Sequence, residues 1–202
     1  MKKIAYIFVA ALVMTACGGD NNSEENTTDT DTTNLEVNEV IEVEEETPKP
    51  PKSPRLESSG TVDGVEVSIA FGSPYVKGRE IWGDLIPYDK IWRAGANDAT
   101  AVTFGEAVLV DGEAVDAGTY ALFIIPTQDN DWTIILNEEW SKEEHGVWGA
   151  YDHKPEKDVL RFDVTPTLDN ENVESLAFTV TESGLSFAWE KVAFQFSIIA
   201  SK

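Results

Sequence analysis

The feature that most constrains the fold is the recurrence of short strand-like runs after residue 54. Val65, Val67, Ile69 and Phe71 alternate with smaller or polar residues, which is the two-residue period of a strand with one buried face. Similar runs follow up to the C-terminus, separated by turn residues rather than by long amphipathic helices. The pattern favours an antiparallel arrangement over a doubly wound parallel fold.

We therefore expect a single all-β domain over residues 54–202, an antiparallel β-sandwich or jelly-roll with about nine strands. Asp63-Gly64 and Asp111-Gly112 predict tight turns. Two short segments, 88–93 and the region around 138–144, are helix candidates. The strands are expected at 61–62 paired with 65–71, and at 100–104, 107–110, 118–125, 132–136, 158–164, 176–181, 185–190 and 192–199.

The first 17 residues predict a signal peptide that ends in a lipid-attachment site. Lys2 and Lys3 precede an apolar run, residues 4–13, which is shorter than the about 20 residues of a spanning helix. Residues 14–17, MTAC, place small residues before the only cysteine of the chain, as in a bacterial lipobox. We predict a lipoprotein in which Cys17 carries a diacylglycerol and palmitate-type chains, anchored to the outer membrane of the cell envelope. An ordinary signal peptide is the alternative.

Residues 18–53 predict a disordered tether. They carry 11 acidic residues and no aromatic residue, so they cannot bury enough apolar surface to offset the entropy of ordering. Prolines near the end should stiffen it. The acidic residues soon after Cys17 resemble the surface-export signal of some outer-membrane lipoproteins, and a solvated spacer explains them equally well. A periplasmic and a surface-exposed domain therefore both stay open.

The charge of the chain excludes some classes of partner. The formal net charge is −22, and residues 54–202 hold 26 acidic and 11 basic residues. Nucleic acid requires a basic footprint, so it is not expected as a partner. Broad contact with anionic lipid head groups is disfavoured for the same reason. The balance is compatible with a neutral ligand or a cation.

Residues 78–97, GREIWGDLIPYDKIWRAGAN, form the candidate binding segment. They have neither helical nor strand periodicity and are punctuated by glycine and proline, which predicts a long ordered connection of the kind that often carries function. Aromatic faces flanked by a few polar groups suit a small polar or carbohydrate-like ligand. The candidate binding residues are Arg79, Trp82, Tyr88, Trp92, Arg93, Asn97, Trp148, Tyr151 and His153.

A purely structural role is the main alternative for this segment. Tryptophan and tyrosine commonly anchor packing, and Arg79 and Arg93 could neutralise Asp84, Asp89 or Asp98 within the loop. In that case the chain would be a structural envelope module. Trp132, Trp140 and Trp189 are interpreted as packing residues.

The sequence predicts no catalytic residue, cofactor or metal site. His145 and His153, with nearby Glu144, Asp152 and Asp158, could form a mixed site, but the histidine spacing fits no standard zinc pattern. There is no G-x-S-x-G motif and no glycine-rich nucleotide motif. A hydrolase that uses two carboxylates is a further alternative, although carboxylate pairs arise by chance in so acidic a domain.

Four separated motifs carry a family resemblance: SPYVKGREIWGDLIPYDKIWRAGANDATAVTF, DGEAVDAGTYALFIIP, DWTIILN and VWGAYDH. Together they resemble an uncharacterised bacterial lipoprotein family, the domain of unknown function numbered 2911. The resemblance covers residues 54–202 and implies an exported, β-rich domain. It brings no established activity, cofactor or catalytic residue. Members often have tyrosine at the position of His153, which argues against a family-wide chemical role for this histidine.

Overall fold

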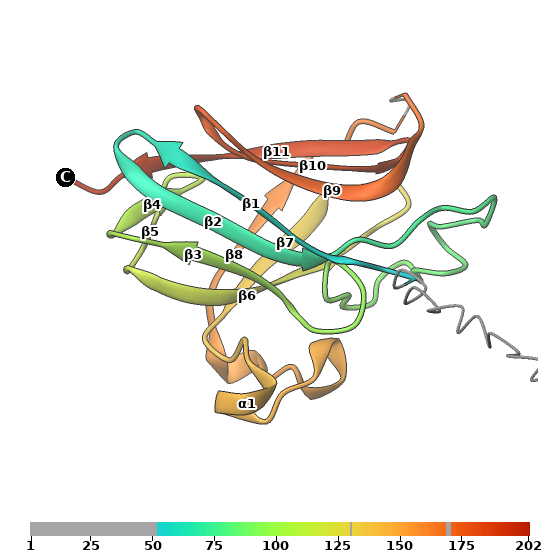
Figure 1. Cartoon of the computed structure of the whole chain (residues 1–202), viewed down its shortest axis with the longest axis horizontal. Coiled ribbons are helices and arrows are strands. Elements are labelled where there is room, and N and C mark those ends of the chain that lie inside the picture. Colours follow the sequence, from blue (N-terminus) through green and yellow to red (C-terminus); the bar gives the residue numbers. More distant parts are fainter. Residues whose placement is uncertain (1–51, 130, 169–170) are drawn as a thin grey trace, which may run out of the picture. The chain divides into compact units, whose positions relative to one another are not determined.

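The computed structural model describes residues 52–129, 131–168 and 171–202, whose strands form two antiparallel sheets (Figure 1). The six-stranded sheet has the order β1-β2-β3-β6-β7-β8, and the five-stranded sheet has the order β5-β4-β11-β10-β9. The first sheet contains β1 (Arg55–Val62), β2 (Val65–Gly72), β3 (Thr100–Phe104), β6 (Gly118–Ile125), β7 (Trp132–Asn137) and β8 (Asp158–Val164). The second contains β4 (Val108–Val110), β5 (Glu113–Val115), β9 (Val173–Thr181), β10 (Gly184–Glu190) and β11 (Val192–Ala200).

The predicted β-sandwich is confirmed, with eleven strands in the described residues rather than about nine. One difference is β1, which begins at Arg55 instead of Thr61. Its sequence RLESSGTV has no apolar alternation, and its position is fixed by pairing with β2 along its whole length, from Arg55 opposite Gly72 to Val62 opposite Val65. The other is β5, a three-residue strand that pairs with β4.

Both predicted Asp-Gly turns are confirmed. Asp63 and Gly64 link β1 to β2 with φ angles of 47° and 86°. Asp111 and Gly112 link β4 to β5 with φ angles of 49° and 90°. Positive φ at both central residues is the backbone geometry that matches the twist of antiparallel strands, and Asp-Gly adopts it readily.

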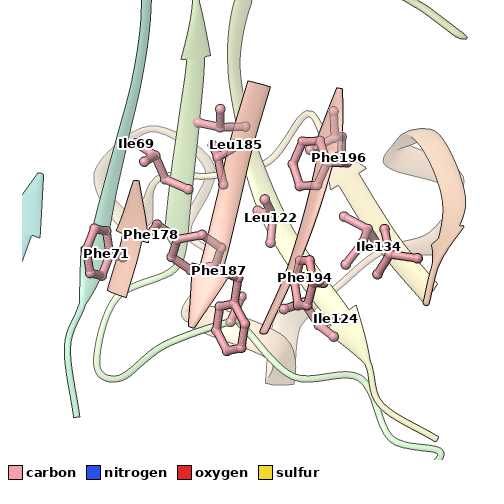
Figure 2. Close-up of a cluster of buried hydrophobic side chains, with 14 of the residues drawn as sticks. Ile69, Phe71, Leu122, Ile124, Ile134, Phe178, Leu185, Phe187, Phe194 and Phe196 are labelled. Carbon is pink, nitrogen blue, oxygen red and sulfur yellow. The ribbon is translucent and has the colours of Figure 1, made fainter. Parts of the chain in front are cut away.

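The hydrophobic core lies between the sheets (Figure 2). Alternate residues of β2 are buried, because a strand directs every second side chain to one face, and Phe71 of β2 packs edge-on against Phe178 of β9 with ring centroids 5.4 Å apart. Phe187 of β10 and Phe194 of β11 stack with ring centroids 4.7 Å apart. Each such buried side chain contributes about 1.5–3 kcal/mol relative to exposure. The core therefore accounts for the alternation in the sequence.

One of the two helix predictions is wrong. Residues 88–93 form no helix, because Asp89 has a φ of 58° and Trp92 pairs with Ile124 as an isolated bridge. The other is confirmed in part: α1 (Lys142–His145) is a single turn, capped by the Ser141 hydroxyl. Two 3₁₀ turns follow, η1 (Gly149–Asp152) and η2 (Pro155–Lys157). Together these turns form the excursion between β7 and β8.

Candidate functional site

The connection between β2 and β3, residues 73–99, leaves and rejoins the sandwich at nearly the same point. The Gly72 carbonyl accepts a hydrogen bond from the Ala96 N–H (3.2 Å). A β-carbon at position 72 would stand 1.9 Å from the Ala96 carbonyl oxygen, so this approach requires glycine. Nearby, the Thr100 hydroxyl donates to the Ala94 carbonyl (3.0 Å). The connection is thus closed at its base.

Two further contacts attach this connection to both sheets. Trp92 exchanges two backbone hydrogen bonds with Ile124 of β6 (2.8 and 2.9 Å), beyond the end of β3. The fully buried Ser73 hydroxyl lies 2.7 Å from the Ser175 hydroxyl and 2.7 Å from the Leu176 carbonyl, both in β9. The connection is therefore held at fixed positions on each sheet, as an ordered loop must be to present side chains.

Four of the six tryptophans pack in one cluster, two from this connection and two from strands β7 and β10. Trp82 contacts Trp92, Trp132 and Trp189 at centroid distances of 5.8, 4.6 and 5.7 Å, and Trp92 stacks on Trp189 at 5.8 Å. Trp132 and Trp189 are fully buried, as their interpretation as packing residues requires. The cluster provides a rigid aromatic base, since such ring pairs add to the stabilisation from burial.

A hollow of about 570 Å³ opens above this base. Its walls come from the 73–99 connection, from η1 and from the tryptophan cluster. Small-molecule sites in proteins commonly have this size and a mainly apolar lining with a few polar groups. The lining residues are Ser53, Pro74, Arg79, Leu85, Ile86, Pro87, Lys90, Ile91, Trp92, Arg93, Gly95, Ala96, Ala150, Tyr151 and Trp189.

The charged side chains of the hollow are all basic. Arg79, Lys90 and Arg93 line it, and no carboxylate among the described residues does. The described ion pairs involve other cations, namely Lys154, Lys157, Arg161 and His153. The alternative interpretation, in which Arg79 or Arg93 pairs with a loop aspartate, finds no such pair in this part of the chain. Arg79 is instead held by the backbone carbonyls of Tyr75 and Val76.

Arg93 has the most unusual environment of the three. Its Nε atom is buried and has no hydrogen-bond partner in residues 52–129, 131–168 and 171–202. The side chain lies against Gly149 of η1, where an added β-carbon would stand 2.7 Å from the Arg93 Cδ atom. The next residue, Ala94, is fully buried with a φ of 54°. Strained backbone of this kind persists only where the surrounding structure fixes it.

Of the nine predicted binding residues, the structure brings Arg79, Trp92, Arg93 and Tyr151 to the hollow. Tyr151 is 84% exposed and comes from η1, more than fifty residues along the chain from Trp92. Two distant segments thus meet at one concave surface. The binding role of these residues stays a prediction.

Three others from the 78–97 segment do not line the hollow. Trp82 lies in the tryptophan cluster, with its indole N–H buried and unpartnered within the described residues. Tyr88 packs on Gly83, and burial, followed by nearby Glu80 and other carboxylates, raises the pKa of its phenol. Asn97 is exposed and donates to the Ser53 carbonyl (3.3 Å). These three side chains contact other parts of the protein and do not line the hollow.

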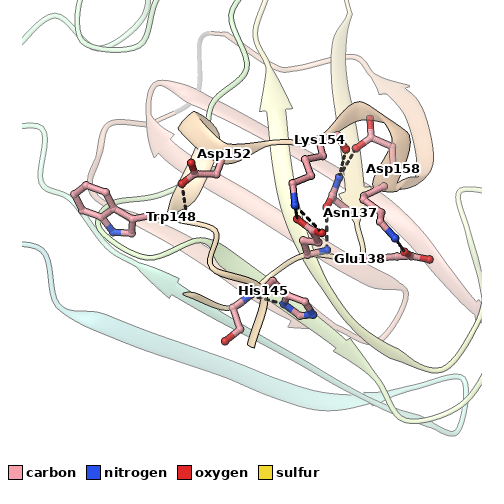
Figure 3. Close-up of polar contacts among 10 residues, drawn as sticks. Asn137, Glu138, His145, Trp148, Asp152, Lys154 and Asp158 are labelled. Atoms are coloured by element: carbon pink, nitrogen blue, oxygen red, sulfur yellow. Dashed lines mark hydrogen bonds and ion pairs between the residues drawn. The ribbon is translucent and has the colours of Figure 1, made fainter. Parts of the chain in front are cut away.

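Trp148, labelled in Figure 3, and His153 both belong to the β7–β8 excursion. Trp148 is 52% exposed and borders a separate hollow of about 120 Å³ beside α1. Its backbone N–H donates to the Asp152 carboxylate (2.7 Å). The imidazole of His153 packs edge-on against Phe123 and has Nε2 2.8 Å from Asp158 Oδ1. His153 is therefore a structural partner of Asp158 in this arrangement.

Asp158 is the centre of the polar network in this excursion. Its side chain is only 6% exposed, and it accepts hydrogen bonds from Asn137 Nδ2 (2.7 Å) and Arg161 Nε (2.8 Å) in addition to His153. Burial alone would raise the pKa of Asp158, but the hydrogen bonds from Asn137, His153 and Arg161 together hold that pKa below its ordinary value. The network fixes the carboxylate in its charged form.

The two histidines do not approach a common metal ligand set. His145 Nδ1 accepts from the Ser141 backbone N–H (3.2 Å), whereas His153 is paired with Asp158. In the described part of the chain there is no group of three or more His, Cys, Asp or Glu side chains arranged to hold a metal ion.

Some lining residues were not in the predicted set. Lys90 and Leu85 belong to the same 78–97 segment. Their closeness to Arg93 in the sequence is the only signal that could have indicated that they line the hollow. Trp189 was interpreted only as a packing residue, and its strand position carries no sign of the hollow beside it. No local pattern indicates that Ala150 would face this segment.

Comparison with known proteins places the chain in a family without an assigned activity. Searches of curated proteins and of solved structures found no match. No helix of the described residues is long and apolar enough to cross a membrane. A family model with the description "Protein of unknown function (DUF2911)" matches residues 53–198. The match spans both sheets and every lining residue of the hollow, and the chain belongs to the DUF2911 family.

Proposed function

We propose that this protein is a lipoprotein of the cell envelope whose β-sandwich domain binds a small ligand in the hollow above Trp92. The observation that carries the proposal is the exposed hollow of about 570 Å³ with an unpartnered Arg93 in its lining. A ligand at such a site would supply acceptors for the hydrogen-bond donors that the protein leaves unused, and the apolar walls favour desolvation of the ligand.

The same observation separates this proposal from its alternatives. A purely structural module calls for an Arg93 paired with carboxylates or carbonyls and for a sealed loop, and neither is found in the described residues. A carboxylate-dependent hydrolase calls for two acidic side chains in the cleft. The lining of the hollow contains none among those residues. Binding without catalysis is therefore the function that we put forward.

The ligand proposal is tested by titrating the full-length protein with envelope glycans, peptides and small polar compounds. Tryptophan fluorescence is a suitable signal, because Trp92 and Trp189 line the hollow. A matched pair of variants locates the binding. Tyr151→Ala removes an exposed lining side chain, and Trp148→Ala removes an exposed aromatic outside the lining.

We expect a saturable signal that Tyr151→Ala weakens by about tenfold and Trp148→Ala leaves unchanged, since a hydrophobic contact of this size contributes on the order of 1.4 kcal/mol. Absence of saturation across the panel, or equal loss in both variants, would reject the hollow as the binding site.

The membrane anchor is a separate part of the proposal and lies outside the described residues. It is supported by the single cysteine at position 17 after a short apolar run. Metabolic labelling with a palmitate analogue should label the wild-type protein, and Cys17→Ser should lose the label and leave the outer-membrane fraction. Mass analysis that found an unmodified Cys17 thiol in the mature protein would disprove it.

A further inference from the structure

We propose that the ligand of this hollow is a small amphiphilic anion, whose carboxylate or phosphate group binds Arg93 and Lys90 and whose apolar body lies on the aromatic wall. The inference rests on the proposed function, since it names the chemical class that the same hollow takes. It reverses the expectation from net charge, which pointed to a neutral ligand or a cation.

The first argument is the local sign of the charge. Residues 54–202 contain 26 acidic and 11 basic side chains. Three of these basic side chains, Arg79, Lys90 and Arg93, line the hollow, and none of the acidic side chains of the described residues does. A concave surface lined by one sign of charge concentrates ligands of the opposite sign. The hollow is thus a basic site on an acidic domain.

The second argument is the state of the Arg93 guanidinium. It always carries a charge and has five N–H donors, which match the two oxygens of a carboxylate or phosphate. In the described residues it forms no ion pair, and its Nε is buried without a partner. Burying such a donor without an acceptor is costly. An anion in the hollow would offset this cost.

The third argument is that the guanidinium is held in place before any ligand binds. Arg93 lies on the bare backbone of Gly149, and its own chain continues into the fixed, positive-φ residue Ala94. Nearby, Arg79 is oriented by two backbone carbonyls, of Tyr75 and Val76. Cations that are already positioned lose little conformational entropy on binding, which favours affinity.

The fourth argument concerns the remainder of the ligand. Leu85 and Tyr151 line the hollow while remaining 40% and 84% exposed, and Trp92 and Ile91 complete an apolar wall. Exposed apolar side chains beside a concave surface indicate a place where a ligand excludes water. An inorganic anion would leave this wall uncovered, so the wall favours an anion with an apolar or aromatic body.

The test compares four probes on the full-length protein by isothermal titration calorimetry. 3-Phenylpropionate, 3-phenylpropanol and 3-phenylpropylamine share a phenylpropyl skeleton and differ in charge, and 3-phenylpropyl phosphate separates phosphate from carboxylate on that same skeleton. We expect one or both anions to bind at least about tenfold tighter than the alcohol, with no measurable binding of the amine. The tighter of the two anions identifies the head group.

Substitutions show which basic side chains bind the anion. Arg93→Gln should weaken the preferred anion by roughly 10- to 100-fold and leave the alcohol unaffected, and Arg93→Lys should restore part of the loss. Lys90→Gln, at an exposed position, should weaken the anion by several-fold with no effect on folding. Lys202→Gln is the matched control, because it removes the same charge at the exposed C-terminus.

The outcomes distinguish this inference from the proposed function. Equal affinity for the acid, the alcohol and the amine would overturn the anion assignment and leave a ligand-binding hollow. The anion assignment would also fall, and the ligand-binding hollow would remain, if none of the four probes binds but a neutral glycan from the ligand titration described above does. If neither set of compounds binds, both proposals fall. Anion binding that survives in Arg93→Gln and Lys90→Gln alike would also overturn the assignment.

Discussion

Arg93 lies across Gly149 so closely that a β-carbon at position 149 would stand 2.7 Å from Arg93 Cδ and 3.3 Å from Nη1. Gly149 also has a φ of 63°, in the left-handed region that favours glycine. The two residues belong to segments that are far apart in the sequence. Their contact joins the β2–β3 connection to η1 and fixes one wall of the hollow.

Gly149→Ala should therefore destabilise the domain and displace the guanidinium. The left-handed backbone costs a non-glycine residue about 1–2 kcal/mol, and the clash with Arg93 should bring the total loss of unfolding free energy to about 2–4 kcal/mol. Urea unfolding measures this loss. Ligand titration should show an accompanying loss of affinity at the hollow.

Gly146→Ala is the matched control for this variant. Gly146 has a φ of 70°, and nothing lies within 4 Å of the position of an added β-carbon. It should therefore lose only the backbone contribution of about 1–2 kcal/mol and bind ligand as the wild type does. Equal effects of the two substitutions would contradict the role of the Arg93 contact.

Trp132 and Trp189 should respond differently to substitution by phenylalanine. Both indoles are fully buried, but Trp132 Nε1 donates to the Thr127 carbonyl (2.9 Å) whereas Trp189 Nε1 has no partner among the described residues. Trp132→Phe loses a hydrogen bond, and Trp189→Phe removes an unsatisfied donor. We expect Trp132→Phe to lower the free energy of unfolding by about 1–3 kcal/mol more than Trp189→Phe does. Equal losses in denaturant titrations would refute this difference.

The eleven strands were largely predictable because most of them bury one face. Where alternation is strong, as in Val65–Phe71, sequence and structure agree. The first six residues of β1 were not predictable, because this edge strand is mainly exposed and is selected by hydrogen bonding to β2. An exposed strand held by backbone hydrogen bonds across a hairpin needs no alternation of apolar residues, so it leaves no periodicity in the sequence.

The failed helix prediction has a similar origin. Residues 88–93 have apolar positions that could suit a short helix, but Trp92 bonds to Ile124 and the Asp89 N–H donates to the Pro126 carbonyl (2.8 Å). These partners lie more than thirty residues away in the sequence. Tertiary hydrogen bonds therefore decide the backbone here, and propensity within the segment does not.

The candidate site was predictable only in part. Arg79, Trp92 and Arg93 stand in one segment whose composition indicated a functional loop, and all three line the hollow. That Arg93 would lack a carboxylate partner could not be read from the sequence, which offers Asp84, Asp89 and Asp98 within nine residues. Whether Arg93 pairs with one of these aspartates depends on the directions of the side chains, and these directions are set only when the β2–β3 connection is folded.

Asp158 should make the stability of the domain sensitive to acid. The folded-state pKa of Asp158 lies below the ordinary value of 3.8. Its stabilising contribution is therefore fully present above a pH of about 4 and is lost as the pH falls through the folded-state pKa. Asp158→Asn should cost about 1–3 kcal/mol at pH 7, and the difference from wild type should shrink as the pH falls below about 4.

Urea midpoints measured at several pH values check this dependence. Asp163→Asn is the control, because Asp163 lies on the same strand and accepts a hydrogen bond from the Thr133 hydroxyl (2.8 Å) at an exposed position. A gap between wild type and Asp158→Asn that does not shrink as the domain is acidified below about pH 4 would contradict the proposed linkage.

Ser73 should be the most sensitive hydroxyl at the base of the β2–β3 connection. It is fully buried, and its side chain bonds to Ser175 and to the Leu176 carbonyl of β9. Ser73→Ala leaves these groups without that partner and should cost about 1–3 kcal/mol in thermal or urea unfolding. Ser186→Ala loses one longer contact of 3.4 Å at an exposed site and should be close to neutral. Similar losses in both variants would refute this view.

The closure at Gly72 and Ala96 has an evolutionary consequence. Because the two ends of the connection touch, the intervening residues can be exchanged as a cassette without changing how β2 and β3 pair. A replacement needs to keep the close approach of its base to Gly72 and a residue whose backbone pairs with Ile124. Selection could in this way change the lining of the hollow among homologues while conserving the scaffold.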